Sequence, residues 1–144
     1  MSAVVQTAKN IGVEPDVLRA FREVESGGAS SAVRFEPHLF FRSRPDTKSQ
    51  IPFTPTAGGY SLTASETNKA AFERAYKIDP VAAIKSTSWG LFQVLGGTIL
   101  PAYGNSPSKF LRAFNREPED FSFKSVEMWF AANPAAAEAA KDNN

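Results

Sequence analysis

Residues 15–28 have the sequence PDVLRAFREVESGG, which carries the clearest helical signal in the chain. Proline is favoured in the first turn of a helix, and a glycine commonly ends one. Between these two signals, apolar residues recur at the spacing of one helical face. They are Val17, Leu18, Phe21 and Val24. We therefore predict an amphipathic helix that begins at Pro15 and ends at the glycine pair.

Similar capping signals recur along the chain and predict a mainly α fold. Helix starts are expected where a capping residue precedes proline or a helical run, or where a capping box occurs. These starts are Ser2, Thr63, Asp79, Ser106 and Asn133. The strongly apolar residues 123–130 predict a helix that is central to the core.

One region lacks the helical pattern. Residues 33–41 alternate between apolar and polar side chains, which predicts a strand with Val33, Phe35 and Leu39 on one face. Pro37 would restrict that strand to a sheet edge or a hairpin arm. Residues 43–62 are rich in Ser, Pro, Thr and Gly and predict a long surface loop. We expect a single mainly α domain over residues 1–144, with a small β-hairpin or loop insertion.

Composition restricts the chemistry that is open to the chain. With 16 basic and 15 acidic residues, the net charge of +1 does not favour a nucleic-acid partner. The absence of cysteine excludes disulfides and thiol chemistry, and the single histidine excludes a histidine-rich metal cluster. The first ten residues do not have the pattern of a signal peptide, and no apolar run reaches the ~20 residues that span a membrane. We therefore expect a protein made in the cytoplasm, with no membrane contact and no cofactor, which carries out acid chemistry through carboxylates or no chemistry at all.

Glu25 is the first candidate for such chemistry. It follows Phe21 by four residues and Leu18 by seven, so we expect it on the apolar face of its helix. It also lies in the last turn, where the helix dipole disfavours a carboxylate. Both effects favour the protonated carboxyl group, as a general acid requires. The alternative is an exposed ion pair with Arg22, three residues earlier.

Several short segments occur together in an order that resembles a known family. They are residues 21–27 (FREVESG), 34–40 (RFEPHLF), 58–60 (GGY), 78–83 (IDPVAA) and 86–93 (STSWGLFQ). The pairing of Glu-Ser with a later Gly-x-x-Gln resembles the lysozyme superfamily, which includes goose-type lysozymes and soluble lytic transglycosylases. The whole ordered set is more similar to the N-acetylmuramidase domain of bacteriophage endolysins, over about residues 10–135.

This resemblance implies a lysozyme-like fold and cleavage of the β-1,4 bond between N-acetylmuramic acid and N-acetylglucosamine in peptidoglycan. Glu25 would be the general acid, and Gln93 would recognise an N-acetyl group through both its donor and its acceptor. Gly90 would allow a ligand or another backbone to approach closely. The small donors that would orient the carboxyl group or a sugar are Ser26, Ser86 and Ser88. Helix capping is the alternative for Ser86 and Ser88, and Trp89 is expected in the core.

The second carboxylate has one main candidate, Glu36, because it matches the Phe-Glu-x-His stretch of the family. Its alternative is an ion pair with Arg34 or His38. Asp46, in the predicted loop, and Asp79, at a helix start, are weaker candidates. A lytic transglycosylase would need Glu25 alone.

Two further residues are predicted to bind substrate. His38 is expected either to bind substrate or to be a hydrogen-bonded structural residue. Tyr60 would reach the cleft from the loop.

The chain also departs from the family pattern. The segment between Gly28 and Arg34 is short, and no Tyr-Asn-Gly segment follows Pro134 before the end at Asn144. These departures leave a second hypothesis, a virion or tail structural protein of lysozyme-like shape with weak or no activity. The expected partners are bacterial peptidoglycan and phage tail or virion proteins. The protein would reach the wall after phage-mediated release or from a virion.

Overall fold

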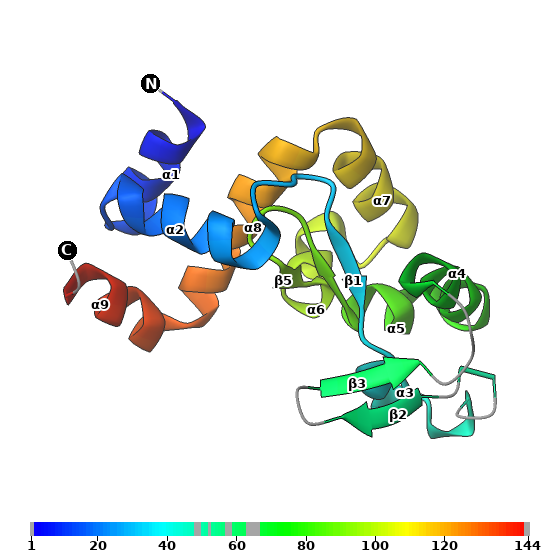
Figure 1. Cartoon of the computed structure of the whole chain (residues 1–144). Coiled ribbons are helices and arrows are strands. Elements are labelled where there is room, and N and C mark those ends of the chain that lie inside the picture. Colours follow the sequence, from blue (N-terminus) through cyan, green and yellow to red (C-terminus); the bar gives the residue numbers. More distant parts are fainter. Residues whose placement is uncertain (1, 48–49, 52, 57–58, 63–66, 143–144) are drawn as a thin grey trace.

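Helices form most of the computed structural model, which describes residues 2–47, 50–51, 53–56, 59–62 and 67–142. Figure 1 shows how these helices surround a small sheet. The α-helices are α1 (Ala3–Ile11), α2 (Pro15–Ser26), α3 (Pro37–Ser43), α4 (Asn68–Ile78), α5 (Pro80–Lys85), α6 (Gly96–Ile99), α7 (Pro107–Arg116), α8 (Pro118–Ala132) and α9 (Pro134–Asp142). Two 3-10 helices are η1 (Pro45–Thr47) and η2 (Leu100–Tyr103). The predicted mainly α class is confirmed.

Local capping chemistry explains where several helices begin. The side chains of Ser2, Asp79 and Ser106 each accept a hydrogen bond from a backbone N–H in the first turn of the helix that follows. The predicted capping box at residues 63–66 lies outside the described residues. Helix α4 is instead capped by Thr67, whose hydroxyl accepts from the Ala70 N–H at 3.1 Å.

The sheet consists of three short antiparallel strands in the order β1 (Val33–Phe35), β4 (Thr87–Trp89) and β5 (Val94–Leu95). A separate antiparallel hairpin is formed by β2 (Phe53–Thr56) and β3 (Gly59–Leu62). In Figure 1 this hairpin lies beside α3, at the opposite end of β1 from α2. Strand β1 therefore connects the region of α2 to the region of α3 and the hairpin.

The outer edge of β1 is covered by one side chain from α4. Asn68 accepts a hydrogen bond from the Phe35 N–H and donates another to the Phe35 carbonyl, both at 2.8 Å. The amide group thus occupies both backbone groups of Phe35, as a neighbouring strand would. This contact holds the end of β1 that leads into Glu36.

Two apolar clusters form the core. The larger one surrounds α8 and contains Trp89, which is 2% exposed and packs edge-on against Phe110 and Phe114. The smaller one joins α3, α4 and α5 around Phe35 and Phe40. The predictions that Trp89 is a core residue and that residues 123–130 lie in a core helix are confirmed.

Two predictions about the irregular region are wrong. The strand expected over residues 33–41 does lie at a sheet edge, as predicted, but it ends at Phe35, because Pro37 occupies the first turn of α3 and Glu36 holds the N-cap position. Val33 is exposed, so the alternating pattern does not define one buried face. The long loop expected over residues 43–62 contains η1 and the β2–β3 hairpin.

Candidate active site

Glu25 lies in the last turn of α2 and is exposed to solvent. The expectation that Glu25 lies on the apolar face rather than the solvent face is wrong, because Glu25 is exposed, the neighbouring Val24 is 83% exposed, and Leu18 is the fully buried residue of α2. The helix end extends beyond the side chains that cover its middle. Glu25 makes no ion pair with Arg22 in the described part of the chain, so the simple pairing alternative is not observed.

Ser26 and Gly27 close the helix directly after Glu25. The Ser26 hydroxyl donates to the Arg22 carbonyl at 3.1 Å and accepts from the Gly28 N–H at 3.2 Å. Gly27 has a left-handed backbone, with φ of +62°, and its N–H donates to the Glu23 carbonyl. Ser26 therefore orders the turn that carries Glu25, and its hydroxyl is already engaged with the backbone.

The end of α2 lies against the turn between β4 and β5. Phe21, one turn before Glu25 on the same helix face, packs edge-on against Phe92 with ring centroids 5.5 Å apart. Phe92 directly precedes Gln93. The Ala32 carbonyl, in the segment after α2, accepts hydrogen bonds from the Gly90 N–H at 2.7 Å and from Gln93 Nε2 at 3.2 Å. The fold therefore brings together the elements that carry Glu25 and Gln93.

Gln93 has a fixed orientation and presents mainly an acceptor. Its backbone has a φ of +50°, and Nε2 also donates to the Gly90 carbonyl at 3.1 Å. Both amide protons are thereby used within the protein, whereas the side-chain carbonyl oxygen makes no hydrogen bond to the described residues. Gln93 was expected to offer substrate both a donor and an acceptor. The structure leaves it the acceptor, and the expectation of a free donor is wrong.

Gly90 allows a close approach, but the group that approaches it is a side chain of the protein and not a ligand. Its φ is +79°, and an added Cβ would overlap the hydroxyl oxygen of Ser122 on α8. That hydroxyl accepts from the Leu91 N–H at 2.9 Å and donates to the Pro118 carbonyl at 2.7 Å. Ser122 thus anchors the turn that carries Gln93. Sequence reasoning did not identify it, and the available signal was a serine between Phe121 and Phe123 in an apolar helix.

Glu36 lies at the opposite end of β1 from the Gly90–Gln93 turn. It comes four positions after Ala32, which corresponds to about 13 Å of extended chain. Its side chain is half-buried and makes no capping hydrogen bond, although Glu36 holds the N-cap position of α3. In the part of the chain that the structure covers, no ion pair joins it to Arg34 or His38.

The remaining predicted site residues lie along β4 or beside α3. Ser86, which is 2% exposed, ends α5, and its carbonyl accepts from the Glu36 N–H. Ser88, 9% exposed, lies between β1 and β5. Both hydroxyls are therefore too covered to be freely available donors. His38 is half-buried in the first turn of α3, and Tyr60 pairs with Pro55 in the hairpin, although its side chain lies outside the described residues.

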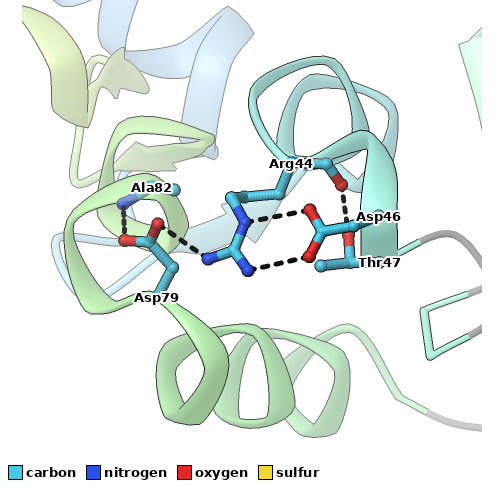
Figure 2. Close-up of polar contacts among 5 residues, drawn as sticks. All are labelled: Arg44, Asp46, Thr47, Asp79 and Ala82. Atoms are coloured by element: carbon cyan, nitrogen blue, oxygen red, sulfur yellow. Dashed lines mark hydrogen bonds and ion pairs between the residues drawn. The ribbon is translucent and has the colours of Figure 1, made fainter.

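The two weaker acidic candidates are held by one arginine (Figure 2). Arg44 donates to both carboxylate oxygens of Asp46 at 3.0 and 2.9 Å and to Asp79 at 3.1 Å. Asp79 also caps α5 by accepting from the Ala82 N–H at 3.0 Å. The hydrogen bonds from Arg44 hold the pKa of Asp46 below its ordinary value. Both carboxylates therefore stabilise the connection of α3 and η1 to α5, which leaves Glu36 as the second candidate.

The described residues have neither a metal-binding cluster nor a membrane-spanning helix. They contain no group of three or more His, Cys, Asp or Glu placed to hold a metal ion. None of their helices has the length and apolar character needed to cross a membrane.

Comparisons with known proteins agree with this fold. No curated protein matches the chain. The crystal structure of Burkholderia AP3 phage endolysin is similar, with a TM-score of 0.73 and 24% identity. The alignment covers 98% of this chain and 57% of the endolysin, so the chain spans little more than half of that protein. The family model of N-acetylmuramidase matches residues 14–142, and the chain therefore belongs to the N-acetylmuramidase family.

Proposed function

We propose that this protein cleaves the β-1,4 bond between N-acetylmuramic acid and N-acetylglucosamine in peptidoglycan. Membership of the N-acetylmuramidase family over residues 14–142 supports the reaction. The observation that carries the site is the contact between Phe21 and Phe92, which brings the end of α2 to the turn of Gln93. An exposed carboxyl group at this position is accessible to a polymeric substrate.

In the proposed reaction Glu25 is the general acid. It donates a proton to the glycosidic oxygen as the bond from that oxygen to C1 of the sugar breaks. A water molecule, or the sugar's own 6-hydroxyl in transglycosylation, forms the new bond to C1 and gives up its proton to a carboxylate. Gln93 positions substrate, because its free side-chain carbonyl accepts a hydrogen bond from the N–H of an N-acetyl group. The bonds from Gln93 to Ala32 and Gly90 keep this acceptor in place before substrate binds.

The lysis of permeabilised Gram-negative cells tests this assignment. Glu25→Gln removes the proton donor, and we expect the clearing rate to fall by about 10²- to 10⁴-fold. Glu23→Gln is the matched control, because Glu23 is an exposed glutamate on the same helix two residues earlier. Equal clearing by the wild type and Glu25→Gln would refute the role of Glu25, and clearing by neither would refute the activity.

Glu36 is proposed as the second carboxylate. Retaining glycosidases separate their two carboxyl groups by about 5–5.5 Å and inverting enzymes by about 6.5–9.5 Å, whereas a transglycosylase needs only the acid. If Glu36 takes part, Glu36→Gln loses activity as Glu25→Gln does. Mass spectrometry of the fragments separates the reactions, because only transglycosylation leaves an anhydro ring. Full activity of Glu36→Gln together with anhydro products would remove Glu36 from the mechanism.

The proposed place of action is the bacterial cell wall, reached through phage-mediated release or from a virion. The similarity to a phage endolysin supports a phage setting for this family member. Immunodetection of the protein in purified virions and in the soluble fraction of infected cells distinguishes the two routes. Detection in virions would favour a tail or virion partner, and its restriction to the soluble fraction would favour release at lysis.

A further inference from the structure

Helices α7 and α8 lie side by side (Figure 1), and residues of both, together with Tyr103 of η2, line a pocket. Its volume is about 390 Å³, which is within the usual range of small-ligand sites. Neither Glu25 nor Gln93 lines it. The proposed muramidase reaction therefore gives this pocket no role.

Three cations on one face of α7 dominate the pocket. Lys109, Arg112 and Arg116 are spaced three and four residues apart, so they follow one helix face over about 10 Å. All three are exposed and make no ion pair with other described residues.

The charge of the pocket remains positive after its acidic residues are counted. A fourth cation, Lys124 on α8, pairs with Asp120 at 3.1 Å, and Glu117 is the other carboxylate of the lining. Four cations against two carboxylates leave an excess of two positive charges, whereas the whole chain has a net charge of only +1. This pocket therefore concentrates positive charge that the rest of the surface balances.

An aromatic ring forms another wall. Tyr103 stacks on Phe121 with ring centroids 5.8 Å apart and an interplanar angle of 15°. The Tyr103 phenol is protonated at neutral pH and can donate a hydrogen bond, and burial raises its pKa further. A ring with a polar end suits a ligand that has both an apolar face and hydroxyl groups.

We propose that this pocket binds a phosphorylated sugar, with the phosphate on the α7 cations and the sugar ring beside Tyr103. A phosphate monoester has a charge of about −1.5 to −2 at neutral pH and three acceptor oxygens. It therefore matches two arginines and a lysine better than a carboxylate with one charge and two oxygens does. The volume is sufficient for one phosphorylated sugar residue. The site does not depend on the proposed reaction, since it uses none of the same residues.

Titration of the ¹⁵N-labelled full chain with glucose 6-phosphate at low salt tests the proposal. We expect saturable amide shifts confined to η2, α7 and the first half of α8, with affinity that falls as salt is added. Arg112→Gln/Arg116→Gln should weaken binding at least about tenfold, because it removes two charge-assisted interactions. Lys69→Gln/Lys77→Gln is the matched control, since it removes the same charge from exposed positions on α4. Glu25→Gln should bind as the wild type does, which separates this site from the muramidase proposal.

Four results would overturn the inference. If the α4 control variant weakened binding as much, the loss of affinity would come from overall charge and not from this pocket. If glucose bound as tightly as glucose 6-phosphate, the phosphate would not be recognised. If glucuronate bound as tightly, the site would not prefer a phosphate to a carboxylate. If inorganic phosphate bound as tightly as glucose 6-phosphate, the sugar would contribute nothing to binding.

The source of the sugar phosphate is tested by pelleting the protein with vesicles that carry lipopolysaccharide. If the wild type pellets with these vesicles and Arg112→Gln/Arg116→Gln does not, the site binds a sugar phosphate of the cell envelope. If the protein binds glucose 6-phosphate but does not pellet with the vesicles, the site binds a soluble sugar phosphate.

Discussion

Substitution of Gly90 by alanine tests whether the Gly90–Gln93 turn depends on its contact with α8. A left-handed backbone costs an L-residue about 1–2 kcal/mol, and the φ of Gly90 is +79°. The new Cβ also overlaps the Ser122 hydroxyl oxygen, and overpacking adds about 1–3 kcal/mol. We therefore expect Gly90→Ala to lower the free energy of unfolding by about 2–5 kcal/mol.

Gly104 provides a matched control. It also has a positive φ, +65°, but an added Cβ would meet nothing within 4 Å. Gly104→Ala should therefore cost only the backbone part, about 1–2 kcal/mol. Urea unfolding followed by the fluorescence of the two tryptophans, Trp89 and Trp129, measures both changes. Equal losses for the two variants would refute the role of the Gly90–Ser122 contact.

A double-mutant cycle provides a stricter test of the same contact. In the wild type, Ser122→Ala leaves the buried Leu91 N–H without its acceptor, which costs about 1–3 kcal/mol. In Gly90→Ala the hydroxyl is already displaced, so Ser122→Ala should cost less there, by about 1 kcal/mol or more. Purely additive losses would mean that Ser122 does not oppose the new methyl group.

Two further predictions concern contacts around the smaller core cluster. Asn68→Ala should lower the free energy of unfolding by about 1–3 kcal/mol in urea, because it leaves both backbone groups of Phe35 unpaired; no loss would mean that water replaces the amide. Arg44→Gln should destabilise the protein near neutral pH, because the lowered pKa of Asp46 contributes stability above its ordinary pKa. That contribution disappears as the pH falls through the folded-state pKa, so thermal unfolding of the two proteins should converge in acid, and a constant difference would contradict the linkage.

The helix ends were predictable from sequence because capping is local. The limits of α2 depend on Pro15 and Gly27 themselves, and both predictions are confirmed. The burial of its apolar face was not predictable, because it depends on what packs against each turn. Phe21 meets Phe92, whereas Val24, less than one turn later, extends past the core and stays exposed.

The site was predictable only where a motif carried it. Ordered motifs identified Glu25 and Gln93, whose roles stay predictions. The engagement of the Gln93 amide and the contact of Ser122 depend on pairings between segments 31 to 61 residues apart. The error at Pro37 has a different cause, since proline after an extended residue fits both an edge strand and the first turn of a helix.

The Asn68 contact also affects how the protein behaves in concentrated solution. An unpaired strand edge is a template on which another chain can extend a sheet. Because the Asn68 amide occupies the outward N–H and carbonyl of Phe35, β1 does not offer these groups to a second molecule. A single polar side chain thus blocks intermolecular pairing at the Phe35 end of β1, without a further strand.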